Sequence, residues 1–226
     1  MTFNHVDIDL PQLKRQTIDG TRFYMVEGKP MVSITSVTSW VNRKIFSDWR
    51  KRVGEDEANR ISKRSTRRGT DTHFLIENYM LNKEIPSSDP LPEMLFKVAK
   101  KELDKIDNIY AIEESLFSKQ LGIAGTVDCI AEYDGELAII DFKTAEKPKP
   151  REWIEHYFVQ AVAYACMFYE ITDIPVKKLI IIMTCENGEV KVYEERDKAK
   201  YIKILMGYIN DFVQNKLEKY GENSTE

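Results

Sequence analysis

The sequence has few cysteines, no long apolar run and no excess of positive charge. Its three cysteines, Cys129, Cys166 and Cys185, stand singly without a Cys-x-x-Cys pair, so neither a disulfide framework nor a zinc site is indicated. No apolar run approaches the ~20 residues of a membrane-spanning helix. The first ten residues match neither a signal peptide nor an Arg-rich transit peptide. We therefore expect reduced thiols and a cytosolic protein that does not bind membranes.

The charge is slightly negative overall but uneven along the chain. A formal net charge of −4 does not by itself indicate nucleic-acid binding. Residues 43–68 differ, because they hold ten Lys or Arg and only four acids. Such a stretch is either a phosphate-binding surface or a solvated helix face, which is the usual meaning of a charge run. Its candidates for phosphate contact are Arg64, Arg67 and Arg68.

Length and pattern together predict the fold class. The 226 residues with 42% hydrophobic content suit one domain with a sizeable core. The order of predicted helices and strands indicates a mixed α/β fold, with a central mixed sheet flanked by helices. We expect an N-terminal hairpin and helical part over about residues 1–108, an α/β core over about 109–218 and a flexible tail over 219–226.

Turn residues, caps and apolar spacing place the individual elements. Residues 1–20 lack periodicity and are predicted to be irregular, and Ser33 or Thr35 is predicted to cap a first helix. A helical pattern over 46–81 has a predicted break at 66–69, after which Thr70 or Asp71 caps a new helix. The other predictions are a hairpin over 22–27 and 31–33, a loop over 84–92, helices over 93–107, 151–169 and 199–217, and strands over 109–117, 178–184 and 189–194.

The most informative stretch is a second predicted hairpin, over residues 122–143. Two β-rich runs, 123–133 and 136–144, flank Asp134-Gly135. Asp-Gly is a strong signal for a two-residue turn, because both central residues of a type I′ turn need φ > 0.

This turn determines which residues face one another. It pairs Tyr133 with Glu136, and counting back along both strands brings Asp128 opposite Asp141. Side chains alternate along a strand, so Asp141 and Lys143 share one face. Facing carboxylates repel each other, and a divalent cation would relieve that repulsion and the cost of burying them. The alternatives are a solvated strand end that binds nothing, or a bulge that shifts the register by one residue.

Two facing carboxylates with a lysine two residues beyond the second meet the needs of metal-assisted phosphodiester hydrolysis. Asp128, Asp141 and the backbone carbonyl of Phe142 offer hard oxygen ligands for Mg²⁺ or Mn²⁺. Lys143 would lie near the attacking water, where it could orient the water, lower its pKa or stabilise charge that builds on phosphorus.

Two further candidate groups lie outside the hairpin. His73 and Glu77 fall at i and i+4 on one side of a helix, although a lone helical histidine is more often a surface or core residue than a metal ligand. On the predicted strand 109–117, either Glu113 or Glu114 must point to the core side, and the pattern leaves open which.

A polar line follows the predicted helix 151–169. His156, Gln160 and Tyr164 lie at successive i+4 steps beside apolar positions. Such a line is most often the wet side of a helix. Because both of its flanks are apolar here, it could instead face a cleft.

The pattern Asp…Asp-Phe-Lys on a hairpin resembles the PD-(D/E)xK nuclease superfamily. Segments that resemble motifs of its RecB-type branch, in the family's order, are Gly69-Thr-Asp-Thr-His73, Gly125-Thr-Val-Asp128, Ile140-Asp-Phe-Lys-Thr144 and Gln160-Ala-Val-Ala-Tyr164. Within that branch the chain is similar to the mitochondrial genome maintenance exonucleases and their phage-encoded relatives, most closely over residues 122–164.

The resemblance implies a restriction-endonuclease-like core and a Mg²⁺- or Mn²⁺-dependent exonuclease. Its partner would be DNA, single-stranded or with free ends or flaps, in replication, recombination or repair, and protein partners stay unknown. The implied metal ligands are Asp128 and Asp141, with His73 near the metal and Lys143 as the catalytic lysine. Supporting or DNA-contacting roles are implied for Gln160, Tyr164, Thr144, Lys147 and Lys149, and Glu114 or Glu113 would complete the acidic cluster.

Two departures from the family pattern shape these expectations. Many RecB-type relatives carry cysteines for an iron–sulfur cluster, and this chain lacks such a set, so we predict no cluster. The absence of a targeting segment favours a bacterial or phage-infected cell. Two other functions remain open, a structure-specific endonuclease and a non-catalytic DNA-binding module with a vestigial nuclease site.

Overall fold

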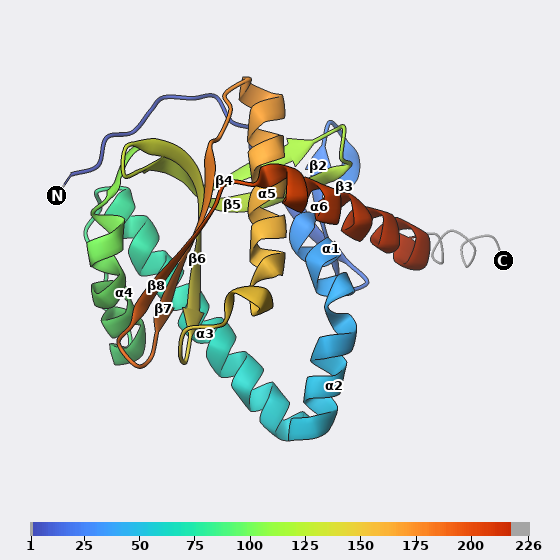
Figure 1. Ribbon diagram of the computed structural model, residues 1–226, viewed down its shortest axis with the longest axis horizontal. Helices are drawn as coiled ribbons and strands as arrows, with labels where there is room; N and C mark the ends of the chain where they lie inside the picture. The colour runs from blue at the N-terminus through green and yellow to red at the C-terminus, as the bar shows by residue number, and fades with distance from the viewer. Residues whose placement is uncertain (1, 218–226) are drawn as a thin grey trace.

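The computed structural model describes residues 2–217 and shows one eight-stranded sheet with helices on both faces (Figure 1). The predicted mixed α/β class is confirmed. The strands are β1 (Lys14–Ile18), β2 (Thr21–Val26), β3 (Lys29–Ser33), β4 (Ile106–Ser118), β5 (Ile123–Tyr133), β6 (Glu136–Ala145), β7 (Lys178–Cys185) and β8 (Val190–Glu195). The helices are α1 (Ile34–Val41), α2 (Arg43–Val53), α3 (Glu55–Met80), α4 (Pro90–Leu103), α5 (Glu155–Thr172) and α6 (Lys198–Phe212), with a 3₁₀ turn at Arg151–Trp153 and a π-helical turn at Val213–Leu217.

Apolar side chains form a core on each face of the sheet. Helices α1, α5 and α6 pack over one face, where Ile34, Phe158 and Phe212 are fully buried. Helices α3 and α4 pack over the other face, with Leu75 and Leu103 among its buried residues. All eight residues of β7 are buried, which accounts for the apolar run over its residues 179–183.

The hairpin of β5 and β6 forms with the predicted turn. Asp134 and Gly135 have φ values of 50° and 73°, as a type I′ turn requires. Tyr133 pairs with Glu136, and the antiparallel ladder continues in that register to Cys129 and Ile140. The predicted register is therefore confirmed up to Cys129 and Ile140, the neighbours of the two aspartates on the side of the turn.

Beyond that pair, β5 and β6 separate. Strand β4 pairs along one edge of β5. The other edge of β5 is shared by two strands, because β6 pairs with it near the turn and β3 pairs with it at Ile123 and Ala124. Strand β6 instead continues beside β7 in parallel as far as Ala145. Asp128 and Asp141 lie where the two strands begin to separate, so their side chains are not held in a regular ladder.

The N-terminal segment is more ordered than predicted. Residues 14–18 form β1, which pairs with β2, instead of an irregular segment. Every residue of β1 is exposed, so this strand has no buried face and no alternation by which the sequence could reveal it. The predicted first hairpin is confirmed as β2 and β3, and the side chain of Ser33 caps α1 by accepting from the Thr35 N–H.

The predicted break at residues 66–69 is wrong. Helix α3 runs through Gly69 without interruption, so neither Thr70 nor Asp71 is a cap. The chain breaks at Gly54 between α2 and α3, where φ is 88°, a conformation that costs glycine little. One glycine within a helix costs only about 1 kcal/mol relative to alanine, which the packing of α3 offsets.

Other boundaries differ from the predictions by a few residues. Helix α4 begins at Pro90, since proline suits the first turn of a helix, and β4 begins at Ile106. Helix α5 begins at Glu155 after a 3₁₀ turn, and Asp197 caps α6 by accepting from the Lys200 N–H. The predicted flexible tail lies outside the described residues. Between residues 2 and 217, no helix combines the length and apolar character needed to cross a membrane.

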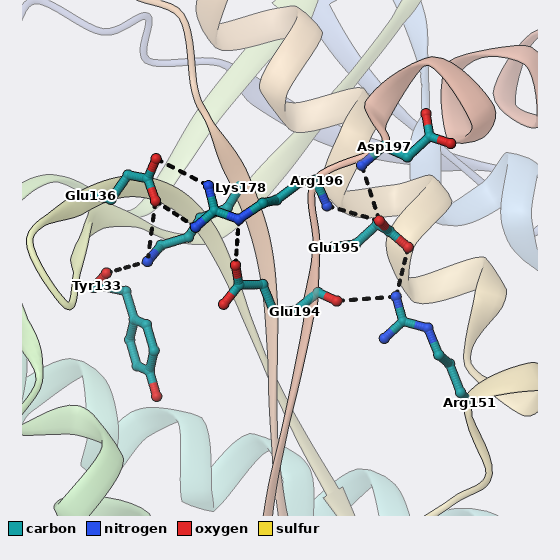
Figure 2. A network of polar contacts seen from close by, with 8 residues as sticks. All are labelled: Tyr133, Glu136, Arg151, Lys178, Glu194, Glu195, Arg196 and Asp197. Atoms are coloured by element: carbon teal, nitrogen blue, oxygen red, sulfur yellow. Dashed lines mark hydrogen bonds and ion pairs between the residues drawn. The ribbon is translucent and has the colours of Figure 1, made fainter.

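A network of charged residues ties the closed end of the hairpin to β7 and β8 (Figure 2). Lys178, only 4% exposed, donates to the Tyr133 carbonyl at 2.5 Å and lies 3.8 Å from a Glu136 oxygen. Arg196 joins the same Glu136 to Glu194 at 2.6 and 2.7 Å. Because a buried ammonium is costly without partners, these contacts favour one strand register at the end of the hairpin remote from Asp128 and Asp141.

Candidate active site

The two aspartates meet backbone and lysine groups where β5 and β6 separate. The Phe142 N–H donates to Asp128 Oδ2 at 2.9 Å. Asp141 is 2% exposed, and its Oδ2 lies 2.5 Å from Lys143 Nζ. Within the described residues, neither Asp141 oxygen accepts a hydrogen bond of ordinary geometry. A buried carboxylate with free acceptor capacity is unfavourable unless a cation or proton satisfies it.

The pKa values of this pair show how its charges are balanced. Burial raises the pKa of Asp141 to about 6, against the opposing effect of Lys143 and with a further contribution from Asp128. Burial lowers the pKa of Lys143, but Asp141 and Asp128 outweigh it and the pKa is raised overall. Lys143 therefore stays protonated at neutral pH and can stabilise negative charge, although it cannot accept a proton.

His73 and Glu113 close the other side of Asp128. His73 Nδ1 lies 3.6 Å from Glu113 Oε1 and 3.8 Å from Asp128 Oδ2. Ligand atoms of these three residues all lie within 4.8 Å of one another. His73 Nε2 lies 2.8 Å from the Phe142 carbonyl, so this carbonyl, an expected metal ligand, is bound to the histidine.

The charge of this cluster favours a cation at the histidine. Burial lowers the pKa of His73, but Asp128 and Glu113 outweigh burial and raise the pKa to about 9. The imidazole is then protonated at neutral pH, so Nε2–H donates to the Phe142 carbonyl and Nδ1–H faces the two carboxylates. The cluster therefore stabilises positive charge next to its carboxylates.

The acidic residue at the cluster is Glu113, and the expectation of Glu114 is corrected. Glu114 accepts a hydrogen bond from Gln12 at 2.9 Å, away from the cluster. Glu113 has a φ of 51° within β4, an irregularity of the kind that redirects a side chain. The flanking pairs place it opposite Asp128. The two adjacent glutamates predicted an acidic side chain at this position of the strand. The alternation of side chains along a strand could not decide between them, because the backbone is irregular at Glu113.

Helix α5 supplies the remaining wall of the site. Gln160 Nε2 lies 3.4 Å from the Tyr164 hydroxyl, and Tyr164 is fully buried, so the predicted polar line is not the wet side of the helix. Tyr157, which the sequence did not single out, has its ring centre 5.0 Å from Lys143 Nζ. Its hydroxyl accepts from Lys149 Nζ at 3.0 Å. Tyr157 thus provides a cation–π contact for Lys143.

Comparison with known families decides the family of the chain. The model of the PD-(D/E)XK nuclease superfamily matches residues 44–218. This chain belongs to the PD-(D/E)XK nuclease superfamily. The expected resemblance is confirmed, and the chain is a nuclease by family.

Curated relatives of this PD-(D/E)XK chain match short segments. Mitochondrial genome maintenance exonuclease 1 of Homo sapiens is 42% identical over 65 residues, 27% of this chain and 18% of that protein. The Mus musculus protein of the same name is 46% identical over 48 residues, 21% of this chain and 14% of that protein. The chain thus spans less than a fifth of these relatives. The crystal structure of SSO0001 aligns with 80% of this chain and 75% of its own, at 17% identity and a TM-score of 0.40.

PD-(D/E)XK nucleases use divalent metals, and the residues of this chain fit one. The carboxylates of Glu113 and Asp128 converge with His73, and Asp141 has unused acceptor capacity at 2% exposure. Oxygen donors of this kind suit a hard divalent cation. Asp141 does not join the convergent group, because its Oδ2 lies against Lys143.

The basic candidates on α3 are already paired. Arg64 binds Glu186 at 2.5 Å, and Arg67 binds Asp89 at 2.6 Å. Arg68 is buried, where it bonds Glu186 and the Thr144 hydroxyl. Arg68 therefore joins α3 to β6 and to the turn after β7, and its contact with DNA stays a prediction.

The other candidates for phosphate contact lie at the end of β6 and just after it. Thr144 is occupied by Arg68 through both its hydroxyl and its carbonyl, and Lys149 by Tyr157. Lys147 is exposed. Of the three, Lys147 is the one whose charge faces solvent without such a contact in the described part of the chain.

Proposed function

We propose that this nuclease is a metal-dependent exodeoxyribonuclease that acts on single-stranded DNA or on free ends and flaps. The observation that carries the proposal is the buried Asp141 paired with a protonated Lys143 beside Asp128. The printed name of the curated relatives, an exonuclease of genome maintenance, supports exonuclease action and a role in replication, recombination or repair.

The metal would be held by the acidic cluster. Asp128, Asp141 and Glu113 would supply hard oxygens, with His73 either as a ligand or as the hydrogen-bond partner of the Phe142 carbonyl. A bound Mg²⁺ or Mn²⁺ would supply Lewis acidity and lower the pKa of a bound water. Such an ion would also stabilise the fold, because it would satisfy the carboxylate oxygens of the buried Asp141.

Lys143 would act as a charge stabiliser. Its pKa is raised overall by Asp141 and Asp128, so it carries a proton at neutral pH. A fixed ammonium beside the scissile phosphate stabilises charge that develops in the transition state and orients the attacking water. Tyr157 and Asp141 hold the ammonium from two sides.

The proposal is tested with end-labelled linear single strands, linear duplex and circular single strands, each with Mg²⁺, Mn²⁺ or EDTA. We expect metal-dependent release of nucleotides from linear strands, no cleavage of circles, and loss of activity in Asp141→Asn. The matched control is Asp107→Asn, a partly exposed aspartate of β4 outside the cluster. Cleaved circles would identify an endonuclease, and DNA binding without any cleavage would identify a vestigial site. Full activity of Asp141→Asn would contradict the assigned chemistry.

A further inference from the structure

Helix α2 carries an apolar stripe that no core covers. Ile45, Phe46, Trp49 and Val53 fall within about 100° of one another around the helix, the width by which a helix normally meets a core. No residue of α2 is buried, and Ile45 and Phe46 are 70% and 50% exposed. Figure 1 shows α2 leading away from the sheet before α3 returns to it. The stripe is therefore open to solvent at Ile45 and Phe46 and partly covered at Trp49 and Val53.

Two of its side chains are aromatic and lie together. The rings of Phe46 and Trp49 have centroids 5.3 Å apart and planes inclined by 33°. The Arg50 guanidinium lies 5.7 Å from the Phe46 ring centre. Exposed rings beside a guanidinium offer flat surfaces on which a nucleobase can stack.

The same helix holds most of the unpaired positive charge of the basic stretch. Six of the ten basic residues of 43–68 form ion pairs within the described chain, and those without one are Lys44, Lys51, Arg52 and Lys63. Three of these four are on α2, whose five cations and one acid give it a charge of +4 in a chain of net charge −4. The free cationic surface is thus on α2.

We propose that α2 binds single-stranded nucleic acid, with unpaired bases stacked on Phe46 and Trp49 and phosphates beside Arg52, which at 100° per residue borders the apolar stripe. A duplex would present its phosphates but not its base faces, so the rings favour a single strand. The choice of occupant rests on the proposed nuclease function and on charge complementarity. A membrane surface, an apolar protein partner and a second copy of this chain are the competing occupants.

Binding without metal tests this platform apart from catalysis. In EDTA, an oligothymidylate and an abasic strand of equal length are titrated with the full chain. Phe46→Ala and Trp49→Ala are each expected to weaken oligothymidylate binding about tenfold, since a stacked base contributes ~1–3 kcal/mol, and to leave abasic binding unchanged. Ile45→Ala is the matched control, an exposed side chain of the same stripe without a π face, and should change neither.

The charged residue gives a separate signature. Arg52→Ala should weaken binding of both strands and reduce the salt dependence, since fewer counterions are released. The ring variants should leave the salt dependence unchanged. Because α2 buries no residue, every variant should melt with the wild type, which excludes unfolding as the cause.

Three results would overturn the platform. One is equal loss on both strands in the ring variants, and another is a loss in Ile45→Ala as large as theirs. The third is wild-type oligothymidylate affinity in the ring variants, where sedimentation and anionic vesicles then identify a second copy or a membrane as occupant. If strands bind by stacking but are never cleaved with metal, the proposed function fails and the platform stands.

Discussion

Tyr164 packs its ring against the backbone of Gly125 so closely that a Cβ on Gly125 would lie 2.8 Å from the ring atom Cε1 and 3.0 Å from Ile34 Cγ2. Gly125 precedes Asp128 by three residues on β5. The glycine thus lets α5 approach the strand that carries the aspartate, and the Gly-Thr-Val-Asp and Gln-x-x-x-Tyr motifs meet at this contact.

Gly125→Ala should therefore be strongly destabilising. Overpacking a tight contact of this kind costs about 1–3 kcal/mol, and the shift of β5 should also lower nuclease activity. Denaturant unfolding and single-strand digestion measure the two effects. The matched control is Gly207→Ala in α6, where no atom lies within 4 Å of the added methyl and alanine should stabilise by about 0.5–1 kcal/mol. Equal stability of the two variants would contradict the close packing.

Lys143 is expected to matter for rate more than for substrate binding. Lys143→Ala should lower kcat by at least ~100-fold, the effect of removing one group that stabilises transition-state charge, with KM little changed. Lys143→Arg keeps the charge and should retain part of the activity. Lys97→Ala, a lysine on α4 whose side chain is 74% exposed, is the control and should leave kcat near wild type. An active Lys143→Ala would remove this residue from the chemistry.

The hairpin could be predicted from sequence because its information is local. Asp134-Gly135 specifies a turn through its φ preferences. That turn determines the pairing of β5 with β6 from the turn out to Cys129 and Ile140. The positions of several side chains at the site depend instead on contacts between distant segments or on irregular backbone. Glu113 enters through an irregular φ, and Tyr157 reaches Lys143 from a helix whose docking no short motif describes.

The sequence shows where basic residues are concentrated, but it does not show which of them are free of ion pairs. The basic stretch of residues 43–68 can be recognised in the sequence. Which of its residues form ion pairs depends on acids distant in sequence, such as Glu186 for Arg64 and Arg68. Similarly, β1 has no buried face and left no periodic pattern. Hydrophobic patterns arise from the burial of side chains. They therefore do not reveal exposed strands or ion pairs between residues that are distant in sequence.

Asp141 should make the metal-free protein less stable as pH rises. Its folded pKa is raised by burial from 3.8 to about 6, so its favourable contribution is present below about pH 3.8 and is lost as pH rises through about 6. The loss amounts to about 3 kcal/mol. In EDTA, unfolding free energies at pH 4.5 and 7 should differ less in Asp141→Asn than in wild type. Asp107→Asn is the control, because hydrogen bonds from Asn4 lower the pKa of Asp107 and place its titration below this window. An unchanged difference in Asp141→Asn would contradict the raised pKa.

His73 should release a proton when a metal binds. Its pKa of about 9 means that the imidazolium competes with a cation for Glu113 and Asp128 at pH 7.5. Mg²⁺ binding should then release protons, measured by calorimetry in buffers of different ionisation enthalpy. His73→Gln should reduce the release. His156→Gln should not, because burial and Lys149 lower the pKa of His156 to about 4 and it carries no proton to lose. Equal release in both variants would place the exchanged proton elsewhere.

Arg68 and Arg67 are adjacent on α3, and their substitutions should separate stability from surface charge. Arg68 is 7% exposed and joins Glu186 to Thr144, so Arg68→Ala leaves Glu186 with fewer partners and should destabilise by about 3 kcal/mol. Arg67, whose side chain is 70% exposed, should change stability by less than about 1 kcal/mol as Arg67→Ala. Thermal unfolding and single-strand binding should be measured on both. If Arg68→Ala kept wild-type stability and lost affinity for DNA, Arg68 would be a substrate contact and its role as a link between α3 and β6 would be wrong.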